Sequence, residues 1–224
     1  MDSKKRPEFF YSLVNPTRTV IEMEKIDYKK TLKHLYKPSS KKIEFIDVPR
    51  FNYLTITGKG RPEGEEYQQA LQSLYPVAYK IKFWIKEKKQ FDYVVPPLEG
   101  LWWADDLSDF IKGNRDEWRW TMMIMQPEPV TQEVVDLVRN VVASKKDAPD
   151  ALDKVEFQTI NEGACAQILH LGPFSEEGPV IQRLHEAIEN EGKSLTGKHH
   201  EIYLSDIRRV PPQKYRTILR QPMG

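Results

Sequence analysis

Glu201 is the side chain in this sequence best suited to act as a general base. The stretch HEIYL at 200–204 has the pattern of a β-strand, and alternation along it puts Glu201, Tyr203 and Ser205 on one face. If Ile202 and Leu204 face a layer of helices, Glu201 and Tyr203 face a groove. A carboxylate enclosed by aromatic rings has a raised pKa, so it can take a proton from water near neutral pH. The alternative is a carboxylate on the surface of a strand.

Glu99 is the second candidate carboxylate, in the segment PLEGLWW. Alternation puts Glu99, Leu101 and Trp103 on one side of the strand and Trp102 on the other. If Glu99 and Glu201 faced each other across a groove, they would resemble an acid–base pair. Two alternatives stay open. The carboxylates could be too far apart to cooperate, or Glu99 could have a structural role, such as accepting backbone N–H groups at the end of the sheet.

Aromatic side chains predict a binding face. The candidates share one face of each of three expected strands, and they are Trp118, Trp120, Met122 and Ile124, then Tyr215, Thr217 and Leu219, then Tyr53 and Thr55. Ring faces attract flat ligands by stacking and cations through the ring quadrupole. Such a strand face is either core or a binding site. Because we expect helices to cover one face of the sheet, we assign the second apolar face to a ligand groove, with Phe174 at one end.

Composition argues against several other functions. A formal net charge of +1 gives no overall positive field that would favour binding to nucleic acid. No apolar segment approaches the roughly 20 residues of a membrane span. Cys165 is the single cysteine and lies in an apolar run, so we expect a buried strand residue rather than a nucleophile. His199 and His200 would point to opposite faces of a strand and make a poor metal pair. We therefore expect no metal and no cofactor, and a cytoplasmic protein because the N-terminus lacks a signal-peptide pattern.

An internal repeat supplies the elements that position these residues. The run IEFIDVPRFNYLTITGKG from residue 43 aligns without a gap with VEFQTINEGACAQILHLG from residue 155, and WTMMIMQP at 120–127 matches YRTILRQP at 215–222. Periodicity predicts strand–strand–helix–strand–strand in each copy, with helices at 65–79, where Pro76 should end or bend the helix, and at 178–191. An amphipathic helix at 131–144 joins the copies.

These patterns predict an α+β fold of two tandem modules related by a pseudo-twofold axis, with antiparallel strands, covering helices and a central ligand groove. We expect an N-terminal extension at 1–40 packed on the core, a first module at 41–130, a linker helix at 131–150 and a second module at 151–224. The extension carries several aromatic residues, which argues against a free tail, and these are Phe9, Phe10, Tyr11, Tyr28 and Tyr36.

Several stretches resemble the GyrI-like small-molecule-binding family. They are VPPLEGLWW at 95–103, GKGRP at 58–62, HHEIYLSD at 199–206 and YRTILRQP at 215–222, and the leading KIDYKKTLKHLY at 25–36 resembles the stand-alone branch of the family. The resemblance implies a groove for flat, often cationic, aromatic compounds around a buried glutamate. It also implies, for the stand-alone branch, hydrolytic opening of the cyclopropane in DNA-alkylating natural products of the duocarmycin type.

On this resemblance we expect a cofactor-free hydrolase. Glu201 would activate water, and Tyr203 would orient it or donate to the oxygen that gains charge. The ligand would contact Glu99 and a set of side chains comprising Tyr53, Trp103, Trp120, Met122, Phe174 and Tyr215. The alternative is a non-catalytic drug-sequestering or sensor module, in which Glu201 balances a cationic ligand. We expect small aromatic partners, no direct contact with nucleic acid or membrane, and leave the oligomeric state open.

Overall fold

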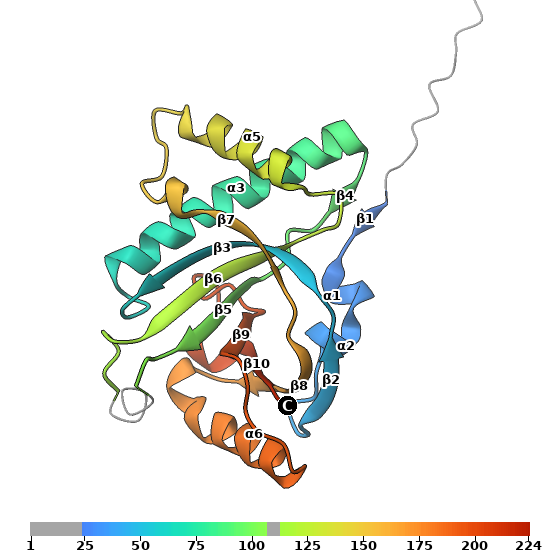
Figure 1. The fold of residues 1–224 in the computed structure, drawn as a ribbon, viewed down its shortest axis with the longest axis vertical. Coiled ribbons are helices and arrows are strands. Elements are labelled where there is room, and N and C mark those ends of the chain that lie inside the picture. Colours follow the sequence, from blue (N-terminus) through green and yellow to red (C-terminus); the bar gives the residue numbers. More distant parts are fainter. Residues whose placement is uncertain (1–23, 107–112) are drawn as a thin grey trace, which may run out of the picture.

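The computed structural model describes residues 24–106 and 113–224. The predicted extension can therefore be followed only from residue 24, and Phe9, Phe10 and Tyr11 lie outside the described residues. An eight-stranded antiparallel sheet forms the centre, with strand order β2-β8-β10-β9-β5-β6-β3-β7 (Figure 1). A second, two-stranded parallel sheet pairs β1 with β4.

The strands are β1 (Lys25–Ile26), β2 (Glu44–Val48), β3 (Phe51–Lys59), β4 (Asp92–Tyr93), β5 (Leu98–Trp103), β6 (Arg119–Gln126), β7 (Glu156–Ile160), β8 (Gly163–Leu171), β9 (His199–Tyr203) and β10 (Arg216–Pro222). The helices are α1 (Tyr28–Thr31), α2 (Lys33–Tyr36), α3 (Glu65–Lys89), α5 (Gln132–Ala143) and α6 (Gly178–Asn190), and short 3₁₀ turns are η1 (Leu152–Lys154), η2 (Phe174–Glu176) and η3 (Pro212–Lys214). The α+β class with antiparallel strands and covering helices is confirmed.

The repeat is visible in the strand order. Corresponding strands lie at equal distances from the centre of the sheet, with β9 and β5 innermost and β2 and β7 at the two edges. The first strand of each repeat is exchanged, since β2 pairs with β8 of the second repeat and β7 pairs with β3 of the first. A pseudo-twofold axis between β9 and β5 would produce this order, and the axis itself stays a prediction.

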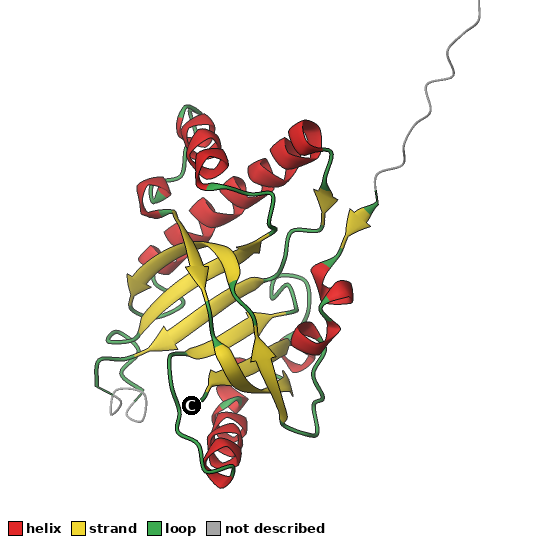
Figure 2. Cartoon of the chain, turned by 45° about the vertical axis from the view of Figure 1, so that its right-hand side comes forward, coloured by secondary structure: helices red, strands yellow, loops and turns green. Residues whose placement is uncertain are grey.

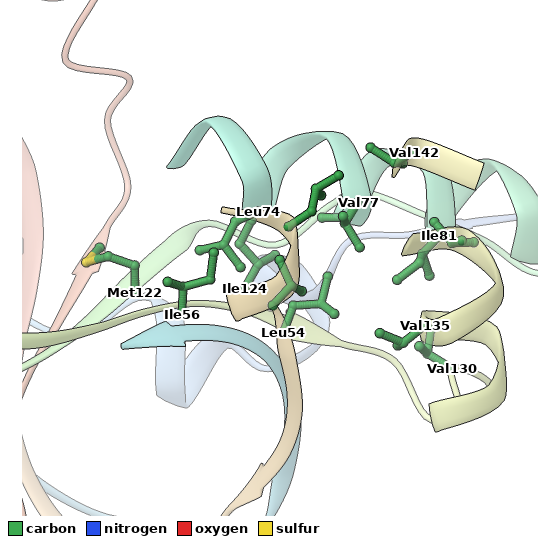
Figure 3. Close-up of a cluster of buried hydrophobic side chains, with 14 of the residues drawn as sticks. Leu54, Ile56, Leu74, Val77, Ile81, Met122, Ile124, Val130, Val135 and Val142 are labelled. Carbon is green, nitrogen blue, oxygen red and sulfur yellow. The ribbon is translucent and has the colours of Figure 1, made fainter. Parts of the chain in front are cut away.

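Helix α3 is longer than predicted. It runs from Glu65 to Lys89 and continues through Pro76, where we expected an end or a bend. A proline inside a helix removes one hydrogen bond and costs about 3 kcal/mol. That cost is offset because Val77, Ile81 and Ile85, all after the proline, are fully buried in the largest core cluster. Figure 3 shows Val77 and Ile81 beside Leu54 and Ile124 of the sheet.

Both covering helix layers lie on one face of the sheet. Directly paired residues of antiparallel strands point to the same side. The register links Leu219, Glu201, Gly100, Met122 and Ile56 across β10, β9, β5, β6 and β3. Leu219 packs in a cluster with residues of α6, and Met122 and Ile56 pack in a cluster with residues of α3. We call this side the helix face.

The two innermost strands lie between the helices. Helix α3 packs on β3 and β6, whereas α6 packs on β8 and β10. Figures 1 and 2 show α3 with α5 at one end of the sheet and α6 at the other. Strands β5 and β9 therefore present their helix-face side chains in the space between α3 and α6.

Candidate active site

Glu201 lies at the centre of the helix face. It belongs to β9, stands across from Gly100 of β5 and from Leu219 of β10, and its side chain is 15% exposed. Gly100 leaves room for the neighbouring polar groups, since a Cβ atom there would lie 2.9 Å from Nε1 of Trp102 and 3.0 Å from the hydroxyl of Tyr203. The sequence thus places its smallest residue opposite the candidate base.

A hydrogen-bond chain leads to Glu201. Nε1 of Trp102 donates to the hydroxyl of Tyr203 at 2.9 Å, and Tyr203 in turn hydrogen-bonds the carboxylate of Glu201. Burial raises the pKa of Glu201 to about 7, although the bond from Tyr203 partly opposes the shift. Glu201 is thus poised to gain or lose a proton near neutral pH, which suits a general base.

A second carboxylate completes a pair with Glu201. Glu177 immediately precedes α6, is buried, and accepts a hydrogen bond from Thr217. Burial and the charge on Glu201 raise the pKa of Glu177 to about 9, so Glu177 is protonated at neutral pH. Its Oε1 atom has no hydrogen-bond partner among the described residues. Two carboxyl groups with separated pKa values are the usual composition of an acid–base pair.

Aromatic rings from α3, from η2 and from both repeats lie near this pair. Tyr67 of α3 stacks on Trp102 with ring centroids 6.1 Å apart, and Phe174 lies edge-on to Tyr203 at 5.8 Å. Phe174 also contacts Tyr215, with centroids 5.3 Å apart. Phe174 is 40% exposed and the four other rings are at least partly buried. The arrangement offers flat, partly accessible ring surfaces beside two carboxyl groups.

The structure brings together only part of the predicted site. Glu201, Tyr203, Phe174 and Tyr215 gather on the helix face, and Trp120 lies there as well. Trp120 is fully buried and reaches the site indirectly, through an edge contact with Tyr67 at 5.4 Å.

Met122 is likewise buried on the helix face, beside Gly100. The three remaining predicted contacts, Tyr53, Glu99 and Trp103, point to the opposite face of the sheet.

The predicted orientation of β9 differs from the structure. We expected Ile202 to face the helices and Glu201 to face the uncovered side of the sheet. Instead Ile202 packs with Leu35 and Ile218 on the opposite face, which residues of α2 cover. The physical reason is that α3 and α6 sit at opposite ends of one face, so a single face holds both the helices and the site between them.

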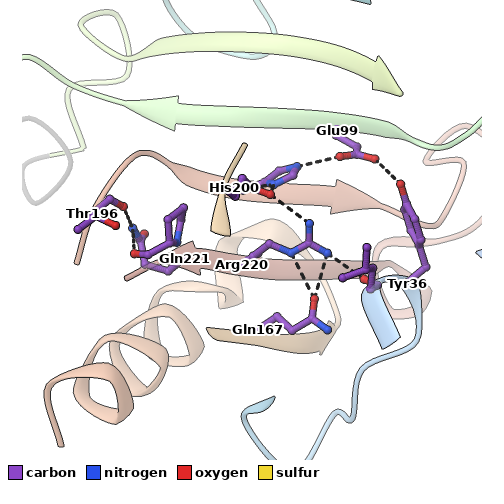
Figure 4. Close-up of polar contacts among 10 residues, drawn as sticks. Tyr36, Glu99, Gln167, Thr196, His200, Arg220 and Gln221 are labelled. Carbon is purple, nitrogen blue, oxygen red and sulfur yellow. Dashed lines mark hydrogen bonds and ion pairs between the residues drawn. The ribbon is translucent and has the colours of Figure 1, made fainter. Parts of the chain in front are cut away.

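Glu99 belongs to a buried ionic network (Figure 4). It accepts a hydrogen bond from the hydroxyl of Tyr36 at 2.9 Å and pairs with Nε2 of His200 at 3.0 Å. Nδ1 of His200 lies 3.0 Å from Glu162, which also pairs with Arg220 at 3.2 Å. Two carboxylates and two cationic side chains thus balance one another within this network.

Burial and neighbouring charges compete within this network. Burial disfavours the charged form of His200, but Glu162 and Glu99 outweigh it and raise its pKa to about 9. Burial also opposes ionisation of Glu162, but His200 and Arg220 lower its pKa to about 2. Arg220 additionally donates to the backbone oxygen of Leu35 at 2.9 Å. The network therefore ties residues 35 and 36 of the N-terminal extension to the sheet.

The chain matches the model of the GyrI-like small molecule binding domain over residues 41–222. It belongs to the GyrI-like family. Among solved structures this GyrI-like chain is 46% identical to an uncharacterized conserved protein from Listeria innocua, with 89% of this chain and 100% of that chain covered and a TM-score of 0.81. Two hydrolases from Listeria innocua are 44% and 43% identical, cover 89% and 90% of this chain over 100% of their own, and give TM-scores of 0.78 and 0.79. No match was found among curated proteins.

Sequence reasoning missed three residues of this GyrI-like site. Trp102 was placed on the side of its strand opposite to Glu99 and was not taken further, and Tyr67 and Glu177 were not singled out. Trp102 could have been found, because alternation already placed it opposite to Glu99 in β5. Glu177 gave no signal of its own, since an acidic residue before a helix is an ordinary helix-start residue.

Two further findings concern the described residues as a whole. No group of three or more His, Cys, Asp or Glu side chains within 24–106 and 113–224 could hold a metal ion. In the same ranges no helix combines the length and apolar character needed to cross a membrane.

Proposed function

We propose that this GyrI-like chain is a hydrolase that adds water to an activated cyclopropane in a flat aromatic compound of the duocarmycin type. The observation that carries the proposal is the carboxyl pair Glu177 and Glu201, held within partly accessible aromatic rings. The two hydrolases from Listeria innocua, at 44% and 43% identity, support the reaction class. The cyclopropane substrate follows from the resemblance of the sequence to stand-alone family members.

The ligand would bind against the rings that surround the carboxyl pair. Tyr67, Trp102, Phe174 and Tyr215 present these surfaces on the helix face. Stacking on such rings contributes about 0.5–1.5 kcal/mol for each pair beyond the area that is buried. Tyr53, Glu99 and Trp103 have no part in this binding, because they lie on the opposite face of the sheet.

The reaction needs one base and one acid. Glu201 takes a proton from water as the water oxygen forms a bond to the cyclopropyl carbon. The strained carbon–carbon bond breaks, and its electron pair passes through the conjugated ring to the carbonyl oxygen. Glu177, protonated at neutral pH, gives its proton to that oxygen. Proton transfer from Glu201 to Glu177 then restores both groups. Tyr203 orients Glu201 through its hydrogen bond.

The second candidate function is binding without turnover. The family description as a small molecule binding domain favours it. In that case Glu201 would balance a cationic aromatic ligand, as carboxylates near ring faces do, and no water would add to the compound.

The test mixes purified protein with excess duocarmycin-type compound and follows the water-addition product by mass. We expect many product molecules per protein in the wild type and at least a 100-fold loss in Glu201→Gln. Glu176→Gln is the matched control, because Glu176 is an exposed neighbour of the site with no place in the mechanism. Saturable binding without product would establish the sequestering module instead.

A further inference from the structure

His199 lies beside the candidate base, has two buried ring nitrogens, and has no role in the mechanism above. It precedes Glu201 by two residues on β9 and therefore shares its face, and it stands across from Trp102. Its side chain is 15% exposed. Neither of its ring nitrogens has a hydrogen-bond partner among the residues that the structure describes. Buried polar atoms are nearly always hydrogen-bonded, so two unpaired nitrogens on one ring require an explanation.

The unpaired nitrogens of His199 do not stand alone. Nε2 of His185 on α6 and Oε1 of Glu177 are also buried without a partner in the described part of the chain. The charge on Glu201 acts on Glu177, and His185 acts electrostatically on His199, so these groups are neighbours. Buried water molecules in proteins typically bond two to four polar groups that would otherwise have no partner.

The distance from His199 to Glu201 fits a bridging water. Nε2 of His199 lies 3.7 Å from Oε1 of Glu201, which is too long for a direct hydrogen bond. A water molecule lying to the side of this contact would be within hydrogen-bond distance of both atoms. That water would lie against the carboxylate that removes its proton.

The protonation state of His199 suits this task. Burial, together with the nearby His185 and His200, lowers the pKa of His199 to about 3. The imidazole is therefore neutral at pH 7 and offers one donor and one acceptor nitrogen. A neutral ring can fix the orientation of a water molecule without competing with Glu201 for its proton.

We propose that His199 is the positioning residue for the hydrolytic water, which it hydrogen-bonds and holds against Glu201. This inference rests on the proposed hydrolase function. It assigns to His199 an effect on the attack of water and none on the binding of the aromatic ligand, whose rings contact other side chains.

The test measures two products of one reaction. Wild type, His199→Phe and His199→Gln are incubated with duocarmycin-type compound, with and without azide. Azide forms its own bond to the cyclopropyl carbon and needs no base to remove a proton. We expect His199→Phe to lose about 100-fold in kcat for water addition, as misplacement of a reactant does, with KM within threefold of the wild type. The ratio of azide adduct to water adduct should rise at least tenfold.

Two comparisons separate positioning from a structural role. His199→Gln places an amide near the position of Nε2, so it should recover part of the water addition that His199→Phe loses. His34→Gln removes an exposed histidine and should match the wild type. Equal loss of both adducts in His199→Phe, a fall in ligand affinity, or no change at all would each overturn the proposal.

A crystal structure of the wild type adds a readout that does not depend on turnover. We expect an ordered water within hydrogen-bond distance of both His199 and Glu201, and a dry contact between them would overturn the assignment. The experiment also distinguishes failure of the hydrolase proposal from failure of the role assigned to His199. If the wild type yields no water adduct, the hydrolase proposal fails and the role of His199 fails with it, whereas a wild-type rate in His199→Phe overturns the role of His199 alone.

Discussion

Glu177 and Glu201 titrate as one pair, because the charge on Glu201 raises the pKa of Glu177 beyond the effect of burial. Glu177 comes from the start of α6 and Glu201 from β9, so the pair exists only once the helix has packed on the sheet. Their apparent pKa values are about 9 and about 7. Between these values one carboxyl is ionised and the other is protonated, which is the state that an acid–base mechanism requires.

The pair predicts a bell-shaped pH profile for hydrolysis. Activity needs ionised Glu201, so kcat/KM should rise with pH through about 7, and it needs protonated Glu177, so kcat/KM should fall through about 9. Initial rates of water addition at low substrate concentration, measured from pH 5 to pH 10, check both limbs. A profile that is flat across this range would contradict the assignment of either carboxyl.

Glu177→Gln separates the acid from the base. The amide cannot donate a proton as an acid does, so kcat should fall about 100-fold or more while ligand affinity stays close to that of the wild type. The alkaline limb of the pH profile should disappear in this variant, whereas the limb near pH 7 should remain. Quenching of tryptophan fluorescence measures affinity, and Glu176→Gln serves as the exposed control. An unchanged kcat would show that Glu177 is not the acid.

The ionic network of Glu99, His200, Glu162 and Arg220 predicts that the stability of the fold also depends on pH. The pKa of His200 is about 9 in the folded protein against an ordinary 6.5, so folding takes up a proton and the contribution of His200 is full below about pH 6.5. It is lost as the pH rises through about 9. His200→Gln should lower the free energy of unfolding by about 3 kcal/mol at pH 6, as breaking a buried pair does.

Urea unfolding of wild type and His200→Gln at pH 6 and pH 10 checks this expectation. The difference between the two proteins should shrink at the higher pH, and a difference that stays constant would contradict a protonated His200. Glu162 acts in the opposite direction: its pKa is lowered to about 2, so its contribution is full above about 4.5 and is lost as the pH falls through about 2.

Periodicity and alternation in the sequence predicted where the strands lie, but they did not predict which face of the sheet the helices cover. Alternation placed Glu201 with Tyr203, and Glu99 apart from Trp102, as β9 and β5 have them. Which face the helices cover depends on packing between distant segments, and local alternation could not show that α3 and α6 pack on the same face as Glu201. The repeat indicates two modules but not the exchange of their first strands, so the pairing of β2 with β8 and of β7 with β3 could not be predicted. The expected end or bend of the helix at Pro76 was wrong for a similar reason, because burial of the turns after Pro76 outweighs the lost hydrogen bond.

Gly100 tests whether the close approach of Trp102 and Tyr203 matters for activity. A Cβ atom at this position would lie 2.9 Å from Nε1 of Trp102, 3.0 Å from the hydroxyl of Tyr203 and 3.1 Å from Cε of Met122. Gly100→Ala should therefore push the two rings apart and break the hydrogen bond through which Tyr203 is held beside Glu201. Because the hydrogen bond from Tyr203 lowers the pKa of Glu201, displacement of Tyr203 should move the acidic limb of the pH profile upward from about 7.

The matched control for Gly100→Ala is Gly178→Ala, where a Cβ atom would meet nothing within 4 Å. Gly178→Ala should keep the wild-type profile, and both variants should be compared by thermal unfolding. If Gly100→Ala folds and shows the wild-type pH profile, then Tyr203 does not set the protonation of Glu201. In that case burial alone must account for a base that ionises near neutral pH.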